Sequence, residues 1–191
     1  MKDKVYVYDA TLREGAQSRG ISFTVSDKIK IARRLDEMGI DYIEGGNPTS
    51  NPKDAEFFKL IKKEQLSHSR LASFGSTRKP GGKAESDPLI NALAQAETET
   101  VAVFGKSWIF HVTDILRTDP EENLAMIYES IRYLSERGRE VVFDAEHFFD
   151  GYKEDAEYAM KALKAAQEAG ASWLALCDTN GGTLPQEIEA I

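Results

Sequence analysis

The stretch Val141–Cys177, VVFDAEHFFDGYKEDAEYAMKALKAAQEAGASWLALC, contains one complete βαβ pattern. Two short apolar runs, Val141–Asp144 and Trp173–Cys177, are typical of strands, and Lys153–Ala169 between them has apolar residues at helical spacing. Gly170 follows the helix where a left-handed C-cap is common. This pattern predicts two parallel strands joined by a right-handed helical crossover.

The same pattern recurs along the whole chain. The predicted strands are Val5–Tyr8, Tyr42–Glu44, Arg70–Phe74, Thr100–Phe104, Val141–Asp144 and Trp173–Cys177. The predicted helices are Ser26–Met38, Pro52–Glu64, Pro88–Ala96, Pro120–Arg137, Lys153–Ala169 and a helix from Pro185 onward. Six βα units of this kind indicate a parallel sheet with a helix after each strand.

Residues at the helix ends support these boundaries. Ser26 is a candidate N-cap, and Asp119 is another because it stands directly before Pro120. Gly39, Gly138 and Gly170 follow three helices as candidate C-caps.

The turn after the first strand separates the two parallel folds that six units could form. Doubly wound sheets usually carry a glycine-rich phosphate turn there, whereas DATLREGAQ, residues 9–17, has a single glycine. We therefore expect an α/β fold of the TIM (β/α)8 barrel type, here incomplete, because a barrel needs eight units and typically about 250 residues. Residues 1–191 would form the N-terminal portion of a barrel catalytic domain. The polar stretch between Gly75 and Asp87 is either an active-site lid or a solvated loop.

Composition narrows the classes of partner. The chain has 24 Lys and Arg against 32 Asp and Glu, a net charge of −8, and no basic run, which argues against nucleic-acid and membrane partners. No apolar run approaches the roughly 20 residues that span a bilayer. MKDKVYVYDA lacks a signal-peptide core, and Cys177 is the only cysteine, so no intramolecular disulfide can form. We expect a cytoplasmic location.

Polar and ionisable residues follow every predicted strand, at the end where TIM-barrel enzymes place their catalytic groups. Carboxylates and imidazoles suit a hard divalent cation, and a guanidinium could bind a keto oxygen or a carboxylate. The candidates are Asp9, Arg13, Glu14, Gln17, Glu44, Asn47, Arg78, Lys106, His111, Asp144, Glu146, His147, Asp178, Thr179 and Asn180.

The run YDATLREGAQ, residues 8–17, resembles the D-T-T-L-R-[DE]-G-x-Q signature of the DRE-TIM metallolyases. That family includes 2-isopropylmalate, homocitrate and citramalate synthases and hydroxymethylglutaryl-CoA lyase. Four further segments resemble its citramalate synthase branch, namely DYIEGGNPTSNPKDAEFF from residue 41, FGKSWIFHVTDIL from 104, FDAEHFFDGY from 143 and LCDTNGGTLPQEI from 176. The resemblance thus covers nearly the whole chain and implies a barrel domain like that of the pyruvate carboxyltransferases.

The resemblance also implies roles for single residues. Arg13 would polarise and bind the ketone of the substrate, and Glu14, where the branch more often has Asp, would be a ligand of a divalent metal (Mn, Mg or Zn). Glu146 would orient the substrate or relay a proton in catalysis, and Thr179 would hold the substrate carboxylate. The remaining residues expected to bind substrate are Gln17, His111 and Asp144.

The implied reaction is a Claisen condensation of acetyl-CoA, the co-substrate, with a small-molecule 2-oxo acid. Pyruvate would give (R)-citramalate on the route to isoleucine, and the full-length protein would be a homodimer. 2-Isopropylmalate or homocitrate synthesis is the alternative within the enzyme class.

A catalytically inert barrel is the alternative of another class, because the family's H-x-H pair of metal ligands is absent from these 191 residues. The three histidines, His68, His111 and His147, are isolated in sequence. His147 is adjacent to Glu146, and adjacent strand residues point to opposite faces, so we expect a structural role for His147. Lys106 and Arg78 would either attract an anionic substrate or be solvated cations.

Overall fold

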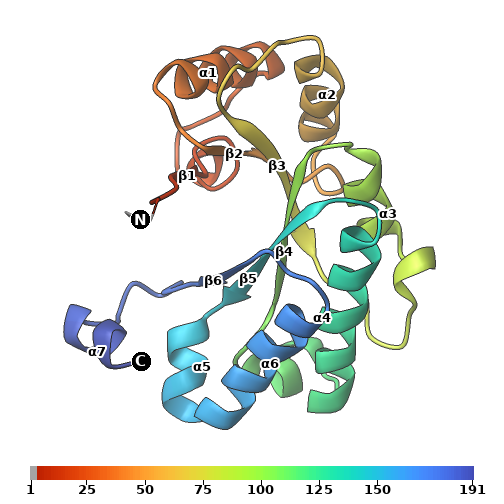
Figure 1. The fold of residues 1–191 in the computed structure, drawn as a ribbon, viewed down its shortest axis with the longest axis vertical. Coiled ribbons are helices and arrows are strands. Elements are labelled where there is room, and N and C mark those ends of the chain that lie inside the picture. The colour runs from red at the N-terminus through yellow and green to blue at the C-terminus, as the bar shows by residue number, and fades with distance from the viewer. Residues whose placement is uncertain (1–3) are drawn as a thin grey trace. The chain divides into compact units, whose positions relative to one another are not determined.

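The computed structural model describes residues 4–191 (Figure 1). Its strands are β1 (Tyr8–Asp9), β2 (Tyr42–Gly46), β3 (Arg70–Ser76), β4 (Thr100–Lys106), β5 (Glu140–Glu146) and β6 (Trp173–Leu176). Its α-helices are α1 (Val25–Glu37), α2 (Pro52–Ile61), α3 (Pro88–Gln95), α4 (Pro120–Ser135), α5 (Phe148–Glu154), α6 (Ala156–Glu168) and α7 (Pro185–Ala190). Short helical turns are η1 (Gly15–Gln17), η2 (Ala84–Ser86) and the π-type turn η3 (His111–Leu116).

The strands follow one another in the sheet in chain order, β1-β2-β3-β4-β5-β6. Parallel registers include Tyr8 opposite Tyr42 for β1 and β2, and Asp144 opposite Ala175 for β5 and β6. A shift between Glu44 and Gly46 interrupts the register of β2 with β3. This order confirms the prediction of an incomplete TIM-type barrel of six βα units.

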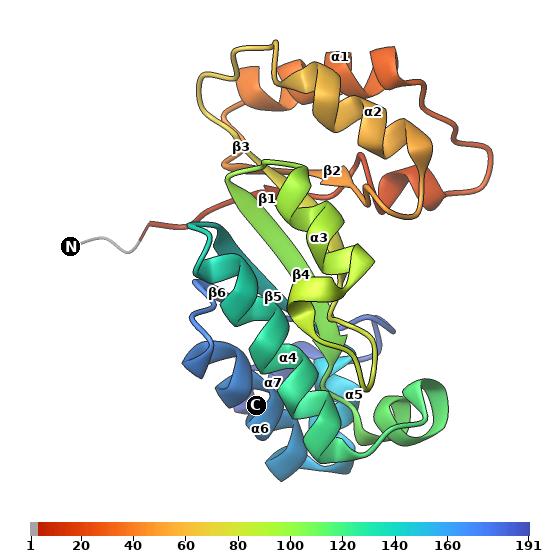
Figure 2. The same cartoon turned by 90° about the vertical axis from the view of Figure 1, so that its right-hand side faces the viewer.

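The chain divides into two compact units, which are described separately. The first unit comprises Met1–Gly75 and Ala92–Val101. In it, α1 and α2 lie side by side and both contact β2, every residue of which is buried (Figures 1 and 2). The apolar faces of these helices bury one core, whose members are Leu12, Ala32, Ile43, Phe57, Phe58, Ile61 and Ala96.

The second unit comprises Ser76–Asn91 and Ala102–Ile191. Helix α6 contacts both α4 and α5, and α4 and α6 both contact β5 (Figure 2). Fully buried side chains from these elements include Ile127, Ile131, Leu134, Phe143 and Ala162. This packing fixes the end of β5, from which several candidate site residues project.

The first strand is shorter than predicted. Only Tyr8–Asp9 forms a strand, whereas Val5, Val7 and Tyr6 are exposed at 41% or more. The N–H of Val7 donates to Asp41 Oδ2 at 2.9 Å, so a side chain takes the place of a ladder carbonyl. The prediction of Val5–Tyr8 was therefore wrong over its first three residues.

The predicted helix Lys153–Ala169 is two helices, α5 and α6, which meet at Asp155. Asp155 leaves the helical region at φ −144°, and its side chain accepts a hydrogen bond from the N–H of Tyr158 at 2.9 Å. An aspartate that caps a new helix in this way competes with continuation of the old one.

The predicted caps are confirmed with one exception. Asp119 caps α4, and Gly39, Gly138 and Gly170 have positive φ after their helices. The N-cap of α1 is Thr24, not Ser26, and Thr24 and Asp27 form a reciprocal capping box. Ser26 lies inside the first turn, where its hydroxyl is too late in the chain to serve as the cap.

The segment between Gly75 and Asp87 is not a fully solvated loop. It contains η2, and Thr77 and Arg78 are buried at 6% and 3% exposure. Arg78 is therefore not a solvated cation, because it forms ion pairs with Glu122 and Glu129 of α4, each at 2.6 Å.

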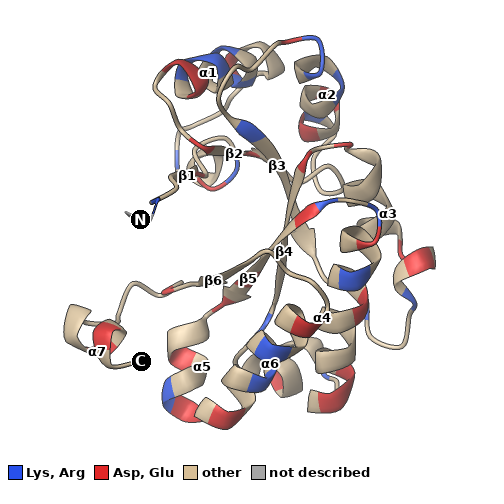
Figure 3. Cartoon of the chain, in the orientation of Figure 1, with Lys and Arg blue, Asp and Glu red and all other residues tan. Residues whose placement is uncertain are grey.

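Lys and Arg positions, in blue, and Asp and Glu positions, in red, are interspersed along the helices of residues 4–191 (Figure 3). Within residues 4–191, no helix is both long enough and apolar enough to cross a membrane.

Candidate active site

The predicted site residues fall in both units, and each group is described within its own unit. Arg13, Glu14 and Gln17 follow β1 in the first unit, whereas Lys106, His111, Asp144, Glu146 and Thr179 lie in the second.

Arg13 is held on two sides in the first unit. Its Nε donates to Glu44 Oε1, its Nη1 pairs with Glu14, and its guanidinium carbon lies 3.8 Å from the centre of the Phe74 ring. Glu44 is 2% exposed and also accepts a hydrogen bond from the Tyr8 hydroxyl at 2.5 Å. A guanidinium held by a buried carboxylate and an aromatic face is preorganised to meet developing negative charge.

The role of Glu44 as the buried partner of Arg13 does not follow from the sequence pattern. Glu44 was a candidate because it ends a strand, yet its partner Arg13 lies 31 positions earlier. Only the pairing of β1 with β2 brings the two together.

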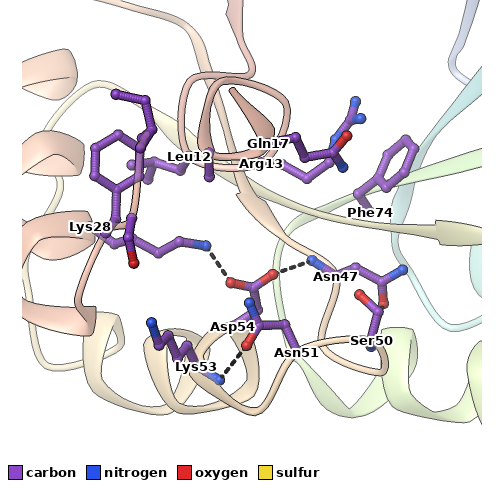
Figure 4. Close-up of a pocket in the computed structure, with 14 residues that line it drawn as sticks. Leu12, Arg13, Gln17, Lys28, Asn47, Ser50, Asn51, Lys53, Asp54 and Phe74 are labelled. Carbon is purple, nitrogen blue, oxygen red and sulfur yellow. Dashed lines mark hydrogen bonds and ion pairs between the residues drawn. The ribbon is translucent and has the colours of Figure 1, made fainter. Parts of the chain in front are cut away.

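A polar cavity of about 250 Å³ opens beside Arg13 and Gln17 in the first unit (Figure 4). The buried ion pair of Lys28 with Asp54 supports its wall, and Asp54 Oδ2 also accepts the N–H of Asn47 at 2.9 Å. The other lining residues include Ser22, Ser50, Asn51, Lys53 and the apolar Leu12 and Phe74. The cavity thus offers hydrogen-bond donors and cations next to the Arg13 guanidinium.

The metal-binding prediction can be tested on the donor set of the chain. Glu14 has a side chain that is 63% exposed and pairs with Arg13. Across residues 4–191, no three His, Cys, Asp or Glu side chains lie close enough together to hold a metal ion. These residues alone do not fit a complete divalent-metal site.

Glu146, at the end of β5, pairs with Lys106, at the end of β4, and both side chains are largely buried at 28% and 14% exposure. Lys106 is therefore neither a fully solvated cation nor an unpaired one. Asp144, two residues earlier on β5, lies 3.1 Å from Cys177 Sγ. Thr179 follows β6, and its hydroxyl oxygen accepts the N–H of His147 at 2.9 Å.

His111 lies in an aromatic cluster of the second unit. Its ring centre is 4.7 Å from that of Trp108 and 4.6 Å from that of His147, and its Nδ1 is buried without a hydrogen-bond partner in the structure. Burial, then the charges of Lys106 and His147, lower the pKa of His111 below its usual range. A neutral imidazole with an unused buried nitrogen suits a polar contact with a small ligand.

The structure thus places these predicted site residues in two groups, one in each unit. Arg13, Glu14 and Gln17 form the first group, and Lys106, His111, Glu146 and Thr179 form the second. His147, for which we expected a structural role, contacts both His111 and Thr179.

An incomplete α/β barrel with paired ionisable groups after its strands has the arrangement typical of TIM-barrel enzymes, whose active sites lie at that end of the strands. Comparison with known proteins makes the class specific. The family model described as HMGL-like matches residues 4–191, so the chain belongs to the HMGL-like (DRE-TIM) family.

Among curated relatives, (R)-citramalate synthase of Aquifex aeolicus is 56% identical over 100% of this chain and 36% of its own length. (R)-citramalate synthase of Sulfolobus acidocaldarius is 58% identical over 96% of this chain and 35% of its own. A probable 2-isopropylmalate synthase of Methanopyrus kandleri is 35% identical over 98% of this chain and 35% of its own. The chain therefore spans about a third of the length of the relatives it matches.

Among solved structures, the HMG-CoA lyase of Bacillus subtilis superposes with a TM-score of 0.78 at 18% identity, covering 98% of this chain and 62% of that one. At this identity the likeness establishes the barrel fold alone.

Proposed function

We propose that the whole protein to which these residues belong condenses acetyl-CoA with pyruvate to give (R)-citramalate, as an acyl-CoA:2-oxo acid C-acyltransferase. The observation that carries the proposal is the gap in identity: citramalate synthases are 46–58% identical to this chain, whereas 2-isopropylmalate and homocitrate synthases are 33–35% identical. The product, (R)-citramalate, would be used in isoleucine biosynthesis.

The proposed reaction requires a proton to leave the acetyl methyl group. The resulting enolate carbon attacks the ketone carbon of the 2-oxo acid, the ketone oxygen takes up a proton, and water cleaves the thioester to release CoA. Negative charge develops on the ketone oxygen during attack, so a fixed cation beside that oxygen lowers the barrier.

Arg13 is the residue we assign to that oxygen. Glu44 and Phe74 hold its guanidinium in place, so little reorganisation is needed when the charge develops. Gln17, which lines the same cavity, would contact the 2-oxo acid.

In the second unit, Glu146 would orient the substrate or relay a proton, and its ion pair with Lys106 would hold its carboxylate in position. Thr179 would donate its hydroxyl hydrogen to the substrate carboxylate. His111 and Asp144 would complete the contacts with substrate.

Glu14 would supply one ligand of a divalent metal (Mn, Mg or Zn). The remaining ligands would have to come from other parts of the whole protein. A homodimer is part of the same proposal, as an expectation from the resemblance to the family.

The test is release of free thiol from acetyl-CoA by the whole protein, with pyruvate, 3-methyl-2-oxobutanoate and 2-oxoglutarate compared in Mg²⁺ or Mn²⁺ and in EDTA. We expect kcat/KM for pyruvate to exceed the others by about tenfold or more, since methylene-scale differences are worth about 1–3 kcal/mol. Preference for a longer oxo acid would assign the protein to the 2-isopropylmalate or homocitrate branch. A folded protein with no thiol release would identify an inert barrel.

A further inference from the structure

His147 has a backbone conformation that is uncommon for a residue with a side chain. It lies between the end of β5 and the start of α5 at φ 55° and ψ 34°, in the left-handed region. Histidine adopts this region more readily than most residues, and β-branched residues almost never do. Such a conformation persists only when surrounding contacts determine it.

The contacts around His147 do determine it. Its ring lies against Trp108 and His111, with ring centres 5.6 Å and 4.6 Å away, and its Nδ1 is 3.0 Å from Asp150 Oδ2. The same carboxylate oxygen accepts Asn180 Nδ2 at 3.0 Å. Asp150 therefore ties the turn after β5 to the segment after β6.

The α5 helix that carries Asp150 cannot shift easily. A Cβ at Gly151 would lie 2.6 Å from the carbonyl oxygen of Ser107 and 2.8 Å from Trp108 Cα, so helix and backbone are in close contact there. The hydroxyl of Ser107 also donates to the carbonyl of Glu146 at 2.9 Å. The position of His147 is thus fixed from both sides.

The consequence of the turn is that the backbone N–H of His147 points to Thr179, 32 residues later, and donates to its hydroxyl oxygen at 2.9 Å. A threonine hydroxyl has one hydrogen to donate and two lone pairs to accept with. Because one lone pair takes the His147 N–H, the oxygen is fixed in place. The hydroxyl hydrogen has no hydrogen-bond acceptor among residues 4–191 and can be donated to a ligand.

We propose that His147 is a positioning residue for Thr179: its left-handed backbone aims the N–H at the threonine oxygen and leaves the hydroxyl as a donor to the carboxylate of the 2-oxo acid. The inference rests on the proposed function, in which Thr179 binds that carboxylate. It adds that backbone conformation, more than imidazole chemistry, is what the reaction needs at position 147.

The test compares side chains that tolerate the left-handed region with one that does not, in the whole protein. His147→Asn keeps the conformation accessible and can still reach Asp150, whereas His147→Val does not. We expect His147→Val to raise KM for the 2-oxo acid by about tenfold, which corresponds to the free energy of one hydrogen bond to a charged group. KM for acetyl-CoA should not change. His147→Asn should lie within about threefold of the native KM, roughly half of the free-energy change that a tenfold shift represents.

Arg117→Val is the matched control, because Arg117 is an exposed residue at φ 55° that has no contact with Thr179. It should cost stability without changing either KM. Equal KM changes in His147→Val and His147→Asn would overturn the inference, because the imidazole and not the backbone would then matter.

Thr179→Ala separates this inference from the proposed function. If Thr179→Ala leaves KM for the 2-oxo acid unchanged, the assignment of Thr179 fails; if it raises KM and His147→Val does not, only the positioning role fails.

Amide exchange of His147 keeps the inference testable should His147→Val not fold. Thr179→Ala should accelerate it by about tenfold and Thr179→Ser should not, since the serine hydroxyl still accepts the bond. Unchanged exchange in Thr179→Ala would overturn the inference.

Discussion

Arg78 Nη1 donates to Glu122 Oε1 at 2.6 Å, in an ion pair whose arginine side chain is only 3% exposed. The Nε of the same guanidinium donates to Glu129 Oε2 at 2.6 Å. The bond from Arg78, followed by that from the N–H of Gly81, lowers the pKa of Glu122 below its usual range. The Arg78 guanidinium is thus paired within the protein and is not available to bind an anionic substrate.

Replacement of Arg78 by Met is expected to lower the free energy of unfolding by about 2 kcal/mol. The value is below the 3–5 kcal/mol typical of a broken buried pair, because Glu122 and Glu129 are 25% and 45% exposed and can be hydrated. Urea unfolding measures the loss. Lys79→Met is the control, since Lys79 is the exposed neighbour, and it should change stability by less than about 0.5 kcal/mol. Equal losses in the two variants would mean that the Arg78 pairs are not formed.

Asp36 provides a prediction about pH. Burial alone would raise the pKa of this carboxyl, but hydrogen bonds from the N–H groups of Ser69, Ser67 and His68 outweigh burial and hold the pKa well below its usual range. A folded pKa below the unfolded value means that the contribution is complete above the unfolded pKa of about 3.9 and is lost as pH falls through the folded pKa.

Asp36→Asn should therefore destabilise the protein at pH 7 by about 2 kcal/mol and flatten the fall in stability below about pH 4. Urea unfolding between pH 2.5 and 7 gives both quantities. Asp114→Asn is the control, because Asp114 is an exposed carboxylate outside the cores. Asp27→Asn would be unsuitable, because it removes part of the cap of α1. If Asp36→Asn and the native protein lose stability in parallel below pH 4, the amide contacts of Asp36 do not carry the effect.

Helix ends could be predicted from the sequence where only one nearby residue could cap the helix. Asp119 before Pro120 could only cap α4, and that prediction is confirmed. Thr24 and Ser26 are both hydroxyl residues, and only the reciprocal bonds with Asp27 distinguish them. The division of α5 from α6 was missed because the helical spacing continues through Asp155, whose side chain caps the second helix.

The positions of the candidate residues after the strands could be predicted from the sequence, but the partners of those residues could not. Arg13 and Glu14 are neighbours in sequence, so their pairing follows from the signature itself. Glu44 is 31 residues from Arg13, and Glu129 is 51 residues from Arg78. Local patterns carry no information about such contacts, because they depend on strand register and on which helix turn faces the sheet.

Glu44→Gln should lower kcat with pyruvate by about tenfold or more, because the neutral amide holds the Arg13 guanidinium less firmly against the proposed developing charge. Steady-state kinetics of the whole protein test this. Glu37→Gln is the matched control: Glu37 is 59% exposed, its pair with Arg34 is on the surface, and its loss should leave kcat unchanged. Equal kcat in Glu44→Gln and the native protein would show that Glu44 does not position Arg13 for the reaction.

Gly46→Ala tests how the cavity beside Arg13 is built. Gly46 has φ +135°, and a Cβ there would overlap the carboxylate of Asp54, the partner of Lys28. Gly20 has φ +83°, but a Cβ at Gly20 would meet nothing within 4 Å, so Gly20→Ala carries the backbone strain without the overlap. We expect a loss of about 1 kcal/mol for Gly20→Ala and at least about 3 kcal/mol for Gly46→Ala, where displacement of Asp54 leaves the buried Lys28 ammonium unpaired. Urea unfolding measures both losses of stability. Equal losses in the two variants would mean that Asp54 can move without destabilising the protein and that the ion pair does not hold the cavity wall.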